Sequence, residues 1–170
     1  RIIVNQGISE SVIKLKNELQ KGNSFGEKVL LVAATKMQGV EAINEAIAAG
    51  VDAVAENKPQ EFRDKNDLLA ACPRHFIGHL QTNKVKYIMN KVAMIHSVDS
   101  VKLAKEISKE AVKHSVRMPV LLEVNVAEEE SKYGFKVAEL MPAIDEIAQL
   151  PGIMVEGLMT IAPFVEDAEE

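Results

Sequence analysis

The chain has 170 residues, 47% hydrophobic and 26% charged, with a net charge of −5 and a single cysteine. This length and balance predict one domain, residues 1–170, with a sizeable core. The mild negative charge and the 4% aromatic content argue against a nucleic-acid partner. No apolar stretch approaches the roughly 20 residues of a membrane span, and the first residues carry no signal-peptide pattern. Cys72 has no intramolecular disulfide partner, so the cytoplasm is the expected location.

Short apolar runs alternate along the chain with segments whose apolar residues recur at helical spacing. Helical stripes are expected at Ile8–Leu19, Val40–Ile47, Leu103–Ala111 and Val137–Ile147. The runs expected to form strands are Val29–Lys36, Val51–Glu56, His75–Gly78, Val92–Val98, Val120–Val126 and Ile153–Met159. Repeated strand-then-helix units with short connections predict an α/β fold with a parallel sheet.

Such a sheet is either open and doubly wound or closed into a barrel. A doubly wound nucleotide binder usually has a glycine-rich turn after its first strand, whereas the turn Lys36–Gly39 has a single glycine. The pattern therefore favours a (β/α)8 TIM-type barrel. Only about six of its eight strands are present, and the acidic end Val165–Glu170 contains no closing strand. We expect the C-terminal part of the barrel to be missing, because an open barrel exposes two strand edges.

The first run, Val29–Lys36, is typical of a strand buried on both faces, and it ends in a lysine. The carboxyl ends of barrel strands are where chemistry is placed. A primary amine there can lose hydration and attack an aldehyde as a free base. A lysine at a strand end can also simply extend its amine into water. The spacing alone leaves both interpretations of Lys36 open.

Other polar residues follow the remaining runs, and parallel strands would gather them at one end of the barrel. They are Glu56, Asn57, Gly78, His79, Ser97, Asn125 and Thr160. About half of them are expected to serve only as caps, since strand ends often carry polar residues. Asn57 could cap the helix that contains Pro59, and Asp99 the helix around Leu103. We expect no metal site, because Gly78 and a strand intervene between His75 and His79.

Several blocks, in this order, resemble the pyridoxal-phosphate homeostasis protein family, stand-alone barrels related to the N-terminal domain of alanine racemase. The blocks are Thr35-Lys36, Ala55-Glu56-Asn57 with Gln60-Glu61, His75–Lys84, Val124–Val126 with Lys132–Phe135, and Gly157–Pro163. The resemblance extends from about Ser9 to Pro163. Ala55 departs from it, because the family commonly has glycine there. The family's C-terminal third, which holds the phosphate and the pyridine nitrogen of the cofactor, has no counterpart.

The resemblance implies that Lys36 forms a Schiff base with pyridoxal 5′-phosphate and that Asn57 and His79 line the cofactor pocket. It further implies a protein that stores the cofactor or delivers it to apo-enzymes without turnover. We expect this protein to be cytoplasmic and a monomer. Lys132 follows an acidic loop and could approach the same end of the barrel as a secondary amine.

Two enzymatic alternatives remain. One is a pyridoxal-phosphate-dependent racemase-like enzyme, which requires acid–base groups on both faces of the substrate carbanion. In the related racemases a tyrosine from an additional domain serves the second face, and this chain has no room for that domain. The other is a barrel aldolase that uses a lysine imine without a cofactor, which the motif blocks disfavour.

Overall fold

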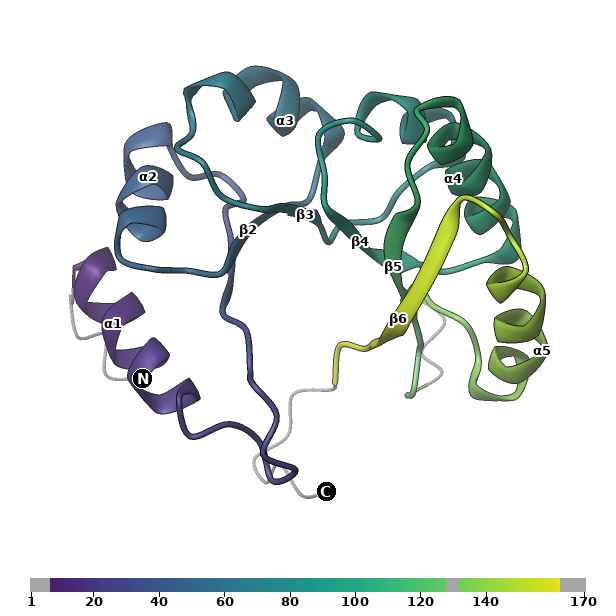
Figure 1. Ribbon diagram of the computed structural model, residues 1–170, viewed down its shortest axis with the longest axis horizontal. Coiled ribbons are helices and arrows are strands. Elements are labelled where there is room, and N and C mark those ends of the chain that lie inside the picture. The colour runs from purple at the N-terminus through teal and green to yellow at the C-terminus, as the bar shows by residue number, and fades with distance from the viewer. Residues whose placement is uncertain (1–6, 128–131, 163–170) are drawn as a thin grey trace. The chain divides into compact units, whose positions relative to one another are not determined.

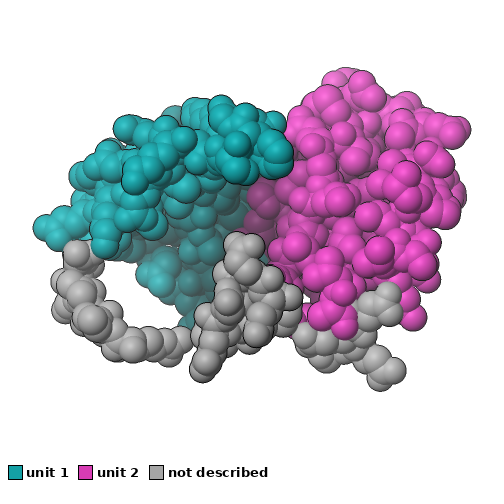
Figure 2. All heavy atoms as spheres, turned by 90° about the horizontal axis from the view of Figure 1, so that it is seen from below, with its two compact units in different colours: residues 1–76 teal, residues 77–170 magenta. Residues whose placement is uncertain are grey.

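The computed structural model describes residues 7–127 and 132–162. Pro163 and the acidic end Val165–Glu170 lie outside the described residues. The chain divides into two compact units, residues 1–76 and 77–170, shown in teal and magenta in Figure 2. Each unit alternates strands and helices, as the sequence predicts. The expectation that residues 1–170 form one domain stays a prediction.

The first unit contains three parallel strands (Figure 1). Its elements are α1 Ile8–Leu19, β1 Val32–Ala34, α2 Val40–Ala48, β2 Ala53–Glu56, α3 Pro59–Lys65, the 3-10 helix η1 Asn66–Leu68, and β3 Arg74–Phe76. β2 pairs with β1 and with β3, and its register aligns Ala55 with Ala34 and Glu56 with Phe76. The carboxyl ends of the three strands therefore lie next to one another.

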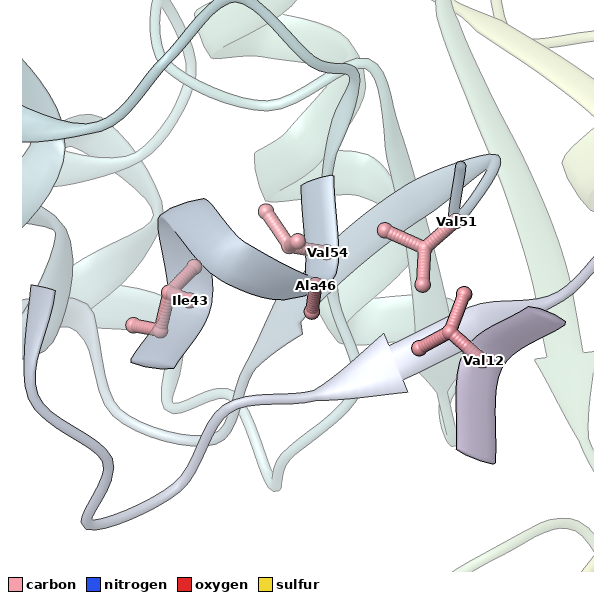
Figure 3. Packing of buried hydrophobic residues seen from close by; sticks show 5 residues of the cluster. All are labelled: Val12, Ile43, Ala46, Val51 and Val54. Carbon is pink, nitrogen blue, oxygen red and sulfur yellow. The ribbon is translucent and has the colours of Figure 1, made fainter. Parts of the chain in front are cut away.

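Apolar residues from α1, α2 and β2 form a core cluster in this unit (Figure 3). Val12 comes from α1, Ile43 and Ala46 from α2, and Val51 and Val54 from β2 and the residues before it. Two of these residues, Val12 and Ile43, belong to the stripes predicted at helical spacing. The 3.6-residue period thus identifies the helix faces that pack on the strands.

The first strand differs from its prediction. It extends only over Val32–Ala34 rather than Val29–Lys36, and none of its residues is fully buried. All four residues of β2 are buried. The reason is the pairing: within the described residues, β1 pairs with β2 alone, whereas β2 lies between two strands. The expectation of a first strand buried on both faces is therefore wrong.

The second unit also has three parallel strands, with β5 paired to β4 and to β6. Its elements are the 3-10 helix η2 Thr82–Tyr87, β4 Met94–Val98, α4 Val101–Lys113, β5 Met118–Glu123, α5 Val137–Ala148 and β6 Ile153–Met159. α4 and α5 pack against the strands and against each other. Ile95, Ile107, Leu122, Ile147 and Ile153 are almost completely buried between these layers.

The six predicted strands and the predicted helices are confirmed, and β6 has its predicted bounds. Both predicted helix caps are wrong. Ser100 caps α4, because its Oγ accepts a hydrogen bond from the Leu103 N–H at 3.2 Å. Lys58 occupies the N-cap position of α3 without a capping side-chain bond. Asp99 and Asn57 are therefore available for other contacts.

Neither membrane helices nor metal clusters occur in the part of the chain that the structure describes. Its helices are too short or too polar to cross a bilayer. No three His, Cys, Asp or Glu side chains of the described residues converge as metal ligands.

Candidate functional site

Lys36 lies in a tight turn immediately after β1. The Gln38 N–H donates to the carbonyl of Thr35 at 3.0 Å, which makes Lys36 and Met37 the two central residues of the turn. Lys36 is exposed, and within the described residues its amine has neither a hydrogen bond nor an ion pair. The predicted position at the junction of strand and loop is confirmed. An accessible, unpaired primary amine is free to react with a carbonyl.

The residue before Lys36 is anchored to the neighbouring strand. Thr35 is buried, and both its N–H and its Oγ1 donate to the carbonyl of Ala55, at 2.9 and 3.1 Å. The backbone of the turn is therefore fixed to β2 where the turn begins, while the lysine side chain extends from it.

Asn57 is placed at the same end of the strands as Lys36. The parallel register pairs Ala34 with Ala55, and Lys36 and Asn57 each follow two residues later. Asn57 is half-buried, and its amide makes no hydrogen bond to the described residues. The structure thus brings two of the three predicted site residues to neighbouring strand ends.

Behind the turn, the carboxyl groups of Glu56 and Glu61 lie beside the amine of Lys65. Glu56 is 3% exposed, and burial raises the pKa of its carboxyl. Burial alone would raise the pKa of Glu61 as well, but the hydrogen bond from Lys65 at 3.1 Å prevails, and the pKa is lowered. Lys65 is 3.9 Å from Glu56, farther than from Glu61. Burial therefore favours the protonated form of Glu56, and the hydrogen bond from Lys65 favours the charged form of Glu61. Both carboxyl oxygens of Glu56 are buried without a hydrogen-bond partner among the described residues.

The third predicted site residue, His79, belongs to the second unit, where two side chains hold its ring. Nδ1 of His79 is 3.3 Å from Oδ2 of Asp99. The ring of Tyr133 stacks on the imidazole at a centroid distance of 3.7 Å and an interplanar angle of 10°. Asp99 and Tyr133 fix both the plane and the edge of the imidazole.

A small cavity of about 180 Å³ lies next to this cluster. It is lined by Glu123, Val124, Asn125, Lys132, Tyr133 and Ile161. Tyr133 both stacks on His79 and lines the cavity. Burial, together with the negative charge of Asp99, raises the pKa of Glu123. The cavity therefore combines a carboxyl that retains its proton more readily than usual with amide, amine and aromatic groups.

Gly134 positions Tyr133 against the end of β5. Its φ of 122° is one that L side chains rarely adopt, and an added Cβ would lie 2.7 Å from the backbone nitrogen of Asn125. This close approach permits hydrogen bonds from Asn125 N–H to Phe135 O at 2.9 Å and from Phe135 N–H to Glu123 O at 2.7 Å. Only glycine fits this position without moving the backbone.

One of the predicted polar residues has a structural role, since Oγ1 of Thr160 donates to the carbonyl of Val124 at 2.9 Å. Ser97 is buried in β4, and its Oγ has no hydrogen-bond partner among the described residues. Sequence reasoning did not identify Asp99 or Tyr133 as partners of His79. Tyr133 had a partial signal, since it belongs to the motif block Lys132–Phe135, but no local pattern pairs it with His79. Asp99 had none, because it is distant from His79 in sequence.

Comparisons with known proteins point to one family. Residues 14–170 match the model for the alanine racemase N-terminal domain. A pyridoxal phosphate homeostasis protein of Aquifex aeolicus is 44% identical over 82% of this chain and 62% of its own length. One from Vibrio alginolyticus is 32% identical over 98% of this chain and 74% of its own length. The structure of PipY from Synechococcus elongatus with pyridoxal phosphate bound has a TM-score of 0.81 and 30% identity, covering 95% of this chain and 74% of PipY.

These matches confirm the predicted fold class, a barrel of the alanine racemase N-terminal type. The chain spans about three fifths of the length of the Aquifex relative and about three quarters of the Vibrio relative. The described strands correspondingly make up only part of an eight-stranded barrel.

Proposed function

Because the chain belongs to the alanine racemase N-terminal domain family, and within it to the pyridoxal phosphate homeostasis proteins, we propose that it binds pyridoxal 5′-phosphate through a Schiff base at Lys36. The observation that carries this proposal is the Lys36 turn, in which an exposed amine, unpaired within the described residues, follows a residue anchored to β2. The bound cofactor of PipY, a 30% identical neighbour, supports it.

The residues present fit the aldehyde end of this cofactor. A Schiff base requires a primary amine that is neither paired with a carboxylate nor buried out of reach, and Lys36 meets both conditions within the described residues. Asn57 adds an amide at the neighbouring strand end, with donor and acceptor groups that can bond polar ring substituents. His79 is the third residue proposed to line the cofactor pocket.

When bound, pyridoxal phosphate supplies an aldehyde carbon that accepts an amine. Lys36 would hold the cofactor through this carbon: its Nζ would supply the electron pair of the new bond, the carbonyl oxygen would leave as water, and no oxidant or reductant would be needed. Thr35, bonded twice to the carbonyl of Ala55, keeps the backbone before the lysine in place.

We propose that this reversible capture serves cofactor homeostasis, that is, storage of the aldehyde or its delivery to apo-enzymes, without turnover of a substrate. The names of the Aquifex and Vibrio relatives support this role. The same proposal includes a cytoplasmic, monomeric protein. The alanine racemase-like alternative requires a second acid–base group opposite the lysine.

The test is the visible absorption of the full-length protein after addition of pyridoxal phosphate and gel filtration. We expect a Schiff-base band with one cofactor per chain, which borohydride removes. Lys36→Ala should abolish the band, while Lys14→Ala, which removes an exposed lysine of α1 in the same unit, should leave it unchanged. A full band in Lys36→Ala would overturn the proposal.

A second measurement separates storage from catalysis. The loaded protein is incubated with amino acids in deuterium oxide, and exchange of the α-hydrogen is followed by NMR. We expect no exchange above the rate of free pyridoxal phosphate. Exchange that depends on Lys36 would favour the racemase-like enzyme instead.

A further inference from the structure

We propose that Lys84, Lys86 and Tyr87 form a docking surface for an acidic segment of a partner protein. The three residues belong to η2, which begins at Thr82, shortly after His79 in the chain. We call them the η2 surface. The proposal goes beyond cofactor binding and does not depend on the reaction proposed for the first unit.

The first observation is the distribution of charge along the chain. The protein has 25 acidic residues among 170 and a net charge of −5, yet no Asp or Glu occurs between Asp67 and Asp99. The second half of this stretch contains the lysines Lys84, Lys86 and Lys91. A positive region on an otherwise acidic protein attracts and orients a partner of opposite charge.

The second observation is that the lysines of the η2 surface have no carboxylate beside them. Within the described residues, the ammonium groups of Lys84 and Lys86 make neither a hydrogen bond nor an ion pair. Lys105 and Lys109 of the neighbouring helix α4 differ, since each has a carboxylate partner, at 2.6 and 3.2 Å. The positive charge of the η2 surface is therefore not compensated locally, whereas that of α4 is.

The third observation is the aromatic ring that the two lysines share. The distance from Nζ to the centroid of the Tyr87 ring is 5.6 Å for Lys84 and 5.1 Å for Lys86, which is cation–π range. Tyr87 is 49% exposed, while Val85 and Ile88 beside it are completely buried and anchor η2 in the second unit. The ring thus gathers two flexible ammonium groups before a partner arrives, which reduces the entropy lost on binding.

These features fit a protein segment rich in carboxylates better than a nucleic acid. Two ammonium groups beside one exposed tyrosine can pair with carboxylates and pack against an adjacent apolar side chain, and tyrosine is enriched at the contacts between proteins. A nucleic acid needs a row of phosphate contacts and several stacking rings. The net charge of −5 would also repel its backbone.

The test uses the full-length, ligand-free protein and an oligoglutamate peptide as the probe. Binding at low salt is followed by the backbone amide shifts in nitrogen-15 NMR. We expect the shifts of Lys84, Lys86 and Tyr87 to change, and the affinity to fall as salt is added, because salt screens exposed charges. Absence of binding at low salt, or shift changes that avoid η2, would overturn the proposal.

Two double variants separate the η2 surface from the charge of the protein in general. Lys84→Gln combined with Lys86→Gln should raise the dissociation constant for oligoglutamate about tenfold. Lys105→Gln combined with Lys109→Gln removes the same charge from α4, where the ammonium groups already have partners. This matched control should change the dissociation constant less than about twofold. Equal weakening in the two double variants contradicts the proposal.

Variants of Tyr87 test whether the ring orders the two lysines. Tyr87→Phe keeps the face of the ring and should bind like the wild type, whereas Tyr87→Ala should bind more weakly. Equally weak binding in both variants contradicts the proposal; if Tyr87→Ala does not fold, the lysine variants decide. The lysine double variant should keep the unfolding temperature of the wild type, because it loses no ion pair. A lower unfolding temperature would assign the lysines to the fold instead.

Two other occupants of the η2 surface would give distinct results. A single-stranded oligonucleotide that binds it more tightly than oligoglutamate at equal salt would assign the surface to nucleic acid. Self-association of the ligand-free protein, seen by sedimentation and lost in the lysine double variant, would assign it to a second copy of the chain. Either result overturns the proposal. Neither bears on cofactor capture, because Lys36 belongs to the other unit.

Discussion

The Lys36 turn and the His79 cluster differ in which part of the residue is held in place. In the first unit the side chain of Lys36 is unpaired within the described residues, whereas the backbone before it is anchored to Ala55. In the second unit the side chain of His79 is itself held, by Asp99 at 3.3 Å and by the stacked ring of Tyr133 at 3.7 Å. The first unit thus restrains the backbone beside Lys36, and the second restrains the side chain of His79.

The difference indicates which kind of role each residue can have. A side chain that forms a covalent bond must be free until its partner arrives, so the surrounding structure can restrain only its backbone. A side chain that shapes a binding surface gains from being held, because no ordering cost remains when a ligand binds. The contacts therefore favour Lys36 as the reacting residue and His79 as part of a surface.

The largest expected effect comes from Gly134→Ala, which should break the His79 cluster. The added Cβ would lie 2.7 Å from the Asn125 nitrogen, at a φ of 122°, so we expect a destabilisation on the order of 3 kcal/mol. Urea denaturation measures it. Gly39→Ala is the control, since nothing lies within 4 Å of its Cβ and its φ is −75°. Equal stability of the two variants would contradict the role of Gly134.

Glu56→Gln tests the electrostatics behind the Lys36 turn. Burial raises the pKa of Glu56 in the folded protein. A carboxyl group whose pKa is higher in the folded than in the unfolded protein stabilises the fold at pH values below its pKa in the unfolded protein. This stabilisation is lost as the pH rises through the pKa of the folded protein. The stability of the wild type should decrease over that window, and the decrease should be smaller in Glu56→Gln. Denaturation midpoints at a series of pH values measure it; parallel curves would show that Glu56 has no raised pKa.

Asp99→Asn tests whether the charge of Asp99 affects the neighbouring carboxyl of Glu123 in the second unit. Burial and then the charge of Asp99 raise the pKa of Glu123, so removing this charge should lower that pKa while leaving it above its usual value. The contact between His79 and Asp99 is partly exposed on the His79 side, so it should itself contribute less than about 1 kcal/mol to stability. Carbon-13 NMR of the Glu123 carboxyl follows the titration. Asp145→Asn on the exposed face of α5 is the control, and an equal shift in both variants would exclude Asp99 as the cause.

Met37→Gly should have the smallest effect. Glycine relieves the strain at φ 61°, but it loses more backbone entropy on folding, and the two terms nearly offset each other. We expect a change between zero and about 1 kcal/mol of stabilisation. Thermal unfolding measures it. A destabilisation of more than about 1 kcal/mol would mean that Met37 is not strained in the folded protein.

The sequence predicts the positions of the strands and the helix faces well, because these depend on local periodicity. Lys36 and Asn57 are predictable as neighbours because parallel strands bring their carboxyl ends together. The stack of Tyr133 on His79 is not predictable, because it joins residues 54 positions apart through a loop whose path depends on Gly134. The exposure of β1 is missed because an apolar run contains no information on how many strands pair with it.

The most direct test of the central claim is to locate the covalent bond. The full-length protein is loaded with pyridoxal phosphate, reduced with borohydride, digested and analysed by mass spectrometry. We expect the phosphopyridoxyl group on the peptide that contains Lys36, at one per chain. A label found instead on Lys132 or spread over surface lysines would contradict this account of the site.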